Sequence, residues 1–141
     1  MLEAANVLGE KETIERVKSF SVQMAQKVFE RGLDSDGSVF YEGDINGIID
    51  SDKHWWPQAE AVVGFINAWQ VSGETHFTQA AVNTWLFIEK YIIDHEKGEW
   101  FWKVTKDGIP DNNEPKVSEW KSPYHNTRAC LEIISRLSKK S

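Results

Sequence analysis

Apolar residues recur at spacings of three and four along most of this chain, a pattern typical of helices that bury one face. The pattern predicts helices over 11–31, from Pro57 to about 70, from Thr75 to about 93, and from Pro123 to about Ser138. A shorter helical segment, 1–8, ends at Gly9. The positions expected to face inward are Ile14, Val17, Ser21, Met24, Ala25 and Val28, then Ala59, Val62, Val63, Ile66 and Trp69, then Phe77, Ala81, Trp85, Ile88 and Ile92, and finally Cys130, Ile133, Ile134 and Leu137.

The predicted helices are joined by connections of two kinds. Short turns surround Gly9 and Gly73, whereas 33–53 and 94–121 are long. In the first long loop, Asn46-Gly47 with the runs 38–41 and 47–50 favours a β-hairpin. The second holds an alternating strand over 99–104 and a turn at 106–108.

The alternation of short and long connections predicts which helix ends lie together. In an array of antiparallel helices, every second connection lies at the same end. Both long loops should therefore share one end with the helix starts that carry Trp55, Trp56 and His125. Two helices per unit of roughly 60–70 residues indicate a solenoid or a closed toroid. We predict one all-α domain, 1–141, that forms part of such a ring.

Composition excludes several classes of protein. The chain has seven Trp and seven Phe, which is too aromatic for a disordered protein. Its net charge of −6 argues against a nucleic-acid partner, and the only short basic run is Lys139-Lys140. No apolar run approaches the roughly 18 residues of a membrane span, so no membrane partner is expected. The start has no basic segment of the kind found in signal peptides, and we expect a cytoplasmic location.

Metal and cofactor sites have no support in the sequence. The single cysteine, Cys130, lies among apolar residues and is expected in the core. His54, His76 and His95 lack the spacing of metal ligands. There is also no glycine-rich phosphate loop, and we expect no metal.

The end with the long loops carries the candidate chemistry. Ser122 is a good N-cap and Pro123 a good first helical residue, which places His125 in the first turn. The positive end of the helix dipole favours neutral imidazole there, and neutral imidazole can act as a general base. Taken locally, His125 is also explained as a polar residue at a helix start. The aromatic residues expected at the same end are Trp55, Trp56, Trp100, Trp102, Trp120 and Tyr124.

These aromatic rings suit a sugar, because C–H faces stack on indole while polar side chains bind the hydroxyl groups. They are equally explained as residues that pack the loops. Glu60 shares a face with Trp56; it fits a bond to a sugar hydroxyl, a role in orienting a histidine, or a favourable charge at a helix start. Arg128 fits stabilisation of an oxyanion, or a pair with Glu132 one turn later.

Three segments resemble the N-acylglucosamine 2-epimerase superfamily, and most closely its cellobiose 2-epimerase branch. They are Trp55-Trp56-Pro-Gln-Ala-Glu60, Gly98-Glu-Trp100-Phe-Trp102 and Trp120-Lys-Ser-Pro-Tyr-His125-Asn-Thr-Arg128. Their order and spacing are those of the family. The resemblance covers essentially the whole chain but corresponds to about the C-terminal third of the family's length.

The resemblance implies an (α/α)6 barrel and epimerisation at C2 of a reducing-end sugar without a cofactor. One histidine removes the C2 proton, an enediolate forms, and a second histidine returns a proton to the other face. The position matching one of them is His125. By the same matching, Trp55, Trp56 and Trp120 line the sugar site and Glu60 holds it; Tyr124 and Arg128 belong to the same segment.

The chain also departs from the family pattern. The second histidine lies in a Gly-His-x-x-Glu motif, which is absent here, and 1–9 resembles the residues that follow it. We therefore expect the C-terminal fragment of a sugar 2-epimerase that is inactive alone. A carbohydrate-binding module and a helical-repeat adaptor are the alternatives. Helix faces left bare by missing neighbours should make the chain self-associate.

Overall fold

The computed structural model describes residues 1–138, so the Lys139-Lys140 run lies outside the described residues. Its helices are α1 (Leu2–Leu8), α2 (Lys11–Lys27), α3 (Trp55–Ser72), α4 (His76–Phe87) and α5 (Tyr124–Ser138). The π-helical turns η1 (Val28–Gly32) and η2 (Ile88–Ile92) extend α2 and α4. The strands are β1 (Glu42–Asp44), β2 (Gly47–Asp50), β3 (Lys53–His54) and β4 (Lys103–Val104).

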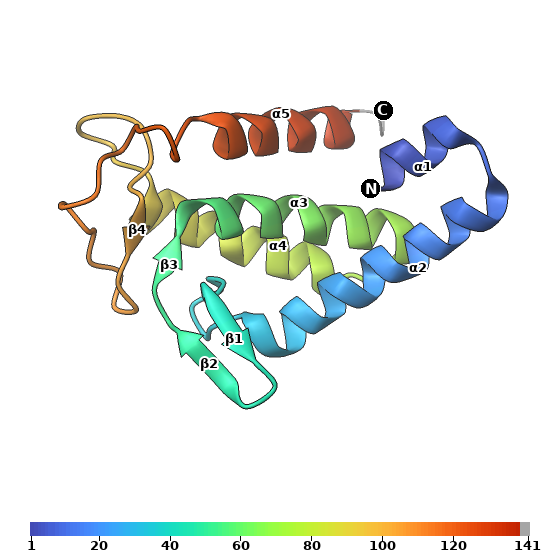
Figure 1. Cartoon of the computed structure of the whole chain (residues 1–141), viewed down its shortest axis with the longest axis horizontal. Helices are drawn as coiled ribbons and strands as arrows, with labels where there is room; N and C mark the ends of the chain where they lie inside the picture. Colours follow the sequence, from blue (N-terminus) through green and yellow to red (C-terminus); the bar gives the residue numbers. More distant parts are fainter. Residues whose placement is uncertain (139–141) are drawn as a thin grey trace.

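Successive long helices run in opposite directions, as the connection lengths predict. Figure 1 shows the loops that carry β1 to β4 at the left end of the molecule and the short turns at the right end. Gly9 and Gly73 close those turns in the left-handed conformation, each with φ of 78°, which glycine adopts without strain. The shared end predicted for the two long loops is therefore confirmed.

The core lies around α3, which packs against α2, α4 and α5 (Figure 1). Eight side chains of α3 are buried, among them Ala59, Val62, Val63 and Ile66. In α4 and η2, Phe77, Ala81, Ile88 and Ile92 are buried as well. The sequence prediction of inward faces is confirmed at these positions.

The inward positions predicted for α2 and α5 are wrong at several places. Met24 is 47% exposed, Ile134 62% and Leu137 47%. Only Asn126 and Ala129 are buried in α5, whose main packing partner is α3. α3 covers only part of the apolar face of α5, so the rest of that face is exposed. Cys130 is half-buried, and burial raises the pKa of its thiol.

The strands differ from their predicted positions. The hairpin has its turn at Asn46-Gly47, but its first strand is Glu42–Asp44 and not 38–41. Asp44 accepts hydrogen bonds from the N–H groups of Asn46 and Gly47 and shapes that turn. The strand predicted over 99–104 is reduced to β4, which pairs with β3.

Two helix starts also need correction. The first helical residue of α3 is Trp55, whose N–H bonds the Trp102 carbonyl at 3.1 Å, so Pro57 lies inside the first turn. The first of α5 is Tyr124, and the Pro123 carbonyl accepts the N–H of Thr127 at 3.0 Å. Pro123 thus takes the capping position that the sequence assigns to Ser122. Thr75 precedes α4 as predicted, without a side-chain capping bond.

Candidate functional site

Two helix starts place a carboxylate, an imidazole and a guanidinium in direct contact. His125 Nδ1 lies 2.9 Å from Glu60 Oε1, and Arg128 Nη2 donates to Glu60 Oε2. Glu60 comes from α3, whereas the two cationic residues come from α5. Their side chains are about one-third exposed, so solvent and ligands reach them.

The Glu60 contact fixes which imidazole nitrogen carries the proton. A carboxylate accepts a hydrogen bond, so Nδ1 is the donor and Nε2 of the neutral ring presents its lone pair. This tautomer leaves Nε2 as a proton acceptor, and the carboxylate stabilises the imidazolium that then forms. Of the three roles that the sequence allows Glu60, the structure supports orientation of a histidine.

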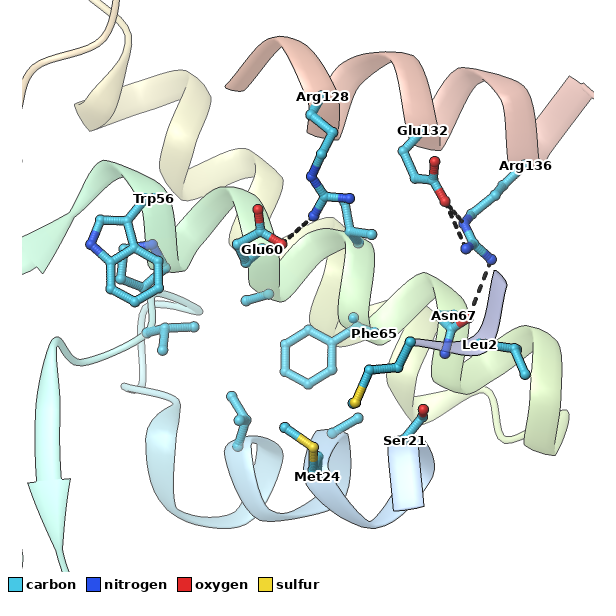
Figure 2. A pocket seen from close by; sticks show the side chains of 18 of the residues that line it. Leu2, Ser21, Met24, Trp56, Glu60, Phe65, Asn67, Arg128, Glu132 and Arg136 are labelled. Atoms are coloured by element: carbon cyan, nitrogen blue, oxygen red, sulfur yellow. Dashed lines mark hydrogen bonds and ion pairs between the residues drawn. The ribbon is translucent and has the colours of Figure 1, made fainter. Parts of the chain in front are cut away.

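Arg128 does not make the pair with Glu132 that the sequence offered as one of its two roles. Its guanidinium is paired with Glu60, while Glu132 pairs with Arg136 at 2.7 Å (Figure 2). The predicted pair between Arg128 and Glu132 is therefore wrong. Because Arg128 neutralises one oxygen of Glu60 and His125 binds the other, both carboxylate oxygens are in use.

Aromatic rings surround His125 on several sides. The centroids of Tyr124, Trp56 and Trp55 lie 5.1, 5.9 and 6.5 Å from its ring. Tyr124 and Trp56 are 62% and 38% exposed and offer accessible faces, but Trp55 is only 4% exposed. The Trp55 ring packs 5.0 Å from Trp102 and belongs to the core beneath His125.

Trp120 stands apart from this cluster. Its side chain is 80% exposed, in the polar turn before α5, and its backbone N–H donates to Ser118 Oγ. Within residues 1–138 its indole makes no ring contact. Trp100, by contrast, is buried and packs against Trp85, which fits the loop-packing explanation of that residue.

An open groove of about 530 Å³ follows α3 and is lined at one end by Trp56, Glu60 and Arg128, whereas His125 is not among its lining residues. Figure 2 shows Trp56, Glu60 and Arg128 at one end of it and Leu2, Asn67 and Arg136 at the other, with Met24 of α2 opposite. Gly64 is on its wall, where an added Cβ would meet nothing within 4 Å. Its volume falls in the range of small-molecule sites.

The other histidines have contacts elsewhere. His54 stacks on Tyr41 at 3.7 Å, and burial lowers its pKa. His76 bonds Gln26 at 3.0 Å, and His95 bonds the Glu89 carbonyl at 2.7 Å. Residues 1–138 contain no cluster of three or more side chains suited to a metal ion. None of the helices in that range has the length and apolar character to cross a bilayer.

Sequence reasoning missed a buried polar group just behind His125. Asn126 and Lys121 are 7% and 0% exposed, and both bond Glu99. One signal for Asn126 was available: it shares helical spacing with Ala129 and Ile133, so it lies on the inner face of α5. Lys121 gives no such signal, since lysine is ordinarily exposed.

The model of the N-acylglucosamine 2-epimerase (GlcNAc 2-epimerase) family matches residues 1–129. The chain belongs to this family. It is 40% identical to the cellobiose 2-epimerase of Dictyoglomus turgidum and 42% identical to that of Ruminococcus albus. These matches cover 96% and 94% of this chain and 34% of each relative. The chain thus spans about a third of the length of these relatives.

Solved structures of the family share the fold. A sugar epimerase from a ruminal bacterium superimposes with a TM-score of 0.90 at 40% identity, over 96% of this chain and 35% of that one. Cellobiose 2-epimerase from Bacillus thermoamylovorans gives a TM-score of 0.79 at 35% identity, over 91% of this chain and 32% of that one. The fold is a partial (α/α)6 barrel, as predicted.

Proposed function

We propose that this chain is the C-terminal part of a sugar 2-epimerase and carries one of its two proton-transfer residues. The substrate class is a mono- or disaccharide with a reducing end, and the reaction interconverts gluco and manno configurations at C2. The observation that carries this proposal is the bond between His125 and Glu60 next to exposed Trp56 and Tyr124. Similarity to cellobiose 2-epimerases supports the reaction type.

In the proposed reaction, His125 Nε2 exchanges a proton with C2 of the ring-opened sugar. Removal of that proton leaves an enediolate, whose negative charge the electropositive start of α5 and Arg128 stabilise. Glu60 keeps the Nδ1 proton in place and stabilises the imidazolium. The electrons return to the C2–H bond when a proton is delivered to the opposite face, so no cofactor is required.

Epimerisation of this kind needs a second acid or base on the other face of C2. His54, His76 and His95 are engaged with Tyr41, Gln26 and Glu89. We therefore propose that the chain alone binds sugar without epimerising it. Trp56, Trp120 and Tyr124 provide exposed rings for stacking, and Trp55 supports His125 from the core.

A sugar titration tests the binding part of this proposal. Cellobiose, mannose and N-acetylglucosamine are added to the chain at millimolar concentrations while tryptophan emission is recorded. We expect a saturable change with at least one sugar, and its loss in Trp56→Ala; Trp85→Phe, away from the groove, is the matched control. No saturable response to any of the three would contradict the proposal, and so would conversion of cellobiose by the chain alone in a proton NMR assay.

We also propose that the chain self-associates through its uncovered helix faces and that it is cytoplasmic. Leu131, Ile134 and Leu137 of α5 are 63%, 62% and 47% exposed on one helix, and Phe20 and Met24 of α2 are also bare. Sedimentation velocity should show a species larger than 16.2 kDa. Ile134→Glu should shift it toward the monomer. A monomer at all concentrations would contradict self-association.

A further inference from the structure

The loop before α5 contains a backbone feature that the site description leaves unexplained. Among residues 1–138, Glu99 is the only residue other than glycine with a positive φ, at 61°. It follows Gly98, which has φ of 73°. The left-handed region is unfavourable for a residue with a Cβ and persists where surrounding contacts hold it.

The Glu99 side chain shows what those contacts are. Its Oε1 accepts hydrogen bonds from Lys121 Nζ at 3.0 Å and from Asn126 Nδ2 at 3.2 Å. Lys121 is fully buried, also donates to the Lys116 carbonyl at 2.6 Å, and lies over the Trp55 ring at 5.3 Å. One carboxylate therefore joins the start of the loop, its end and the first turn of α5.

The start of α5 is otherwise held by the bonds of His125 and Arg128 to Glu60 and by the tryptophan rings beside His125. Ser122 does not cap the helix, and Asn126 and Ala129 are its only buried residues within the described range. His125 directly precedes Asn126, on the neighbouring position of the same turn. The direction in which the His125 ring points toward Glu60 is thus coupled to the way Asn126 is held.

The other long loop has a similar buried lysine but a different connection. Lys53 is fully buried, bonds Asp34 at 2.9 Å and lies over the Phe40 ring at 3.6 Å, directly before α3. Asp34 otherwise bonds Ser35 in its own loop. It makes no hydrogen bond into α3, where eight buried side chains already hold the helix.

We propose that Glu99 is a positioning residue for His125, which acts through Asn126 and Lys121 to hold the start of α5 so that His125 Nδ1 faces Glu60. This proposal rests on the proposed role of His125. Under this proposal, the orientation of His125 depends on the Glu99 carboxylate as well as on Glu60. Asn126→Ala removes the link to the helix and leaves the pair between Glu99 and Lys121 intact.

The tautomer of His125 provides a direct readout that needs no sugar. Long-range proton–nitrogen NMR spectra of the uniformly labelled chain at pH 8 distinguish a proton on Nδ1 from one on Nε2. The unmodified chain should show His125 with the proton on Nδ1. Glu60→Ala removes the acceptor and marks the direct loss of that preference, and Thr127→Ala, an exposed change in the same turn, is the matched control.

In Glu99→Ala and Asn126→Ala we expect loss of the Nδ1–H signal of His125 in favour of Nε2–H, and no change in Thr127→Ala. Dispersed indole signals show that each variant is folded; if Glu99→Ala is not, Asn126→Ala decides alone. Folded variants that keep the Nδ1–H signal of the unmodified chain would overturn the proposal. Because no sugar is present, this result is independent of whether the chain binds or converts one.

Discussion

The helices α3 and α5 each carry part of the candidate site, yet they are held in different ways. α3 packs against α2, α4 and α5 and buries eight side chains. α5 packs mainly on α3 and buries two. Glu60 and Trp56 therefore lie on a helix with buried side chains along most of its length. His125 and Arg128 lie beside the only two buried residues that the structure describes in α5, whose far end is held by polar bonds from Arg136 to Asn67 and Gln70. The contacts of the preceding loop matter more for His125 than for Glu60.

The largest expected effect on the free energy of unfolding comes from a substitution in the buried helix α3. Phe65 of α3 is 1% exposed, whereas Ile134 of α5 is 62% exposed. Phe65→Ala should lower the free energy of unfolding by about 3–5 kcal/mol through lost burial and a cavity. Ile134→Ala should change it by no more than about 0.5 kcal/mol. Urea unfolding followed by circular dichroism measures both, and equal losses would remove the distinction between the helices.

The two buried lysines provide the next test. Glu99→Ala and Asp34→Ala each leave a fully buried lysine without its carboxylate, and each should cost roughly 1–3 kcal/mol of unfolding free energy. Glu99→Ala also breaks part-buried bonds to Asn126, whereas the further bonds that Asp34→Ala breaks, to Ser35, are exposed, so the loss in Glu99→Ala should be greater by about 1 kcal/mol. The same urea series measures this difference. A larger loss in Asp34→Ala would contradict the greater dependence of α5 on its loop.

A smaller effect on stability is expected when Asp94, in the loop that precedes α5, is protonated at low pH. The hydrogen bond from Lys116 lowers the pKa of Asp94 from 3.8 to about 2. The folded state therefore favours the carboxylate, and this contribution is complete above pH 3.8 and lost as the pH falls toward 2. Asp94→Asn should be less stable than the unmodified chain at pH 7, and the difference should shrink below pH 4. Thermal unfolding between pH 7 and pH 2 measures it; a constant difference would count against this pairing.

The smallest effect is expected near neutral pH at the start of α3. Burial lowers the pKa of His54 from 6.5, because the folded state favours the uncharged ring. Below pH 6.5 the unfolded chain binds this proton more readily, so stability falls until the pH passes the folded-state pKa. Between pH 8 and pH 5, the melting temperature of His54→Gln should fall less than that of the unmodified chain. An identical loss in both chains would show that His54 does not contribute.

The same difference in packing explains how far the sequence could predict the fold. α3 and α4 were predictable because their buried positions repeat regularly and Gly73 marks the turn between them. The pairing of β3 with β4 was not, since two-residue strands have no repeating pattern. The burial of Lys53 and Lys121 was hidden as well, because their apolar surroundings come from distant aromatic residues.

The candidate site was predictable in part for a similar reason. The shared end of the two long loops brings Glu60, His125 and Arg128 together, and the alternation of connection lengths was sufficient to predict it. The exposure of individual rings was not predictable from spacing. Trp55 is buried and Trp120 is largely exposed, although each begins a segment that resembles the family.

The most direct test of the central claim uses a chimera. The segment of the Ruminococcus albus cellobiose 2-epimerase that matches this chain over 134 residues is replaced by the corresponding residues of this chain. Conversion of cellobiose at C2 is then followed by proton NMR. We predict an active chimera, whose rate falls by about 10²–10⁴-fold on His125→Ala, the range for loss of a general acid or base. A folded chimera without activity, or one whose activity survives His125→Ala, would contradict the claim.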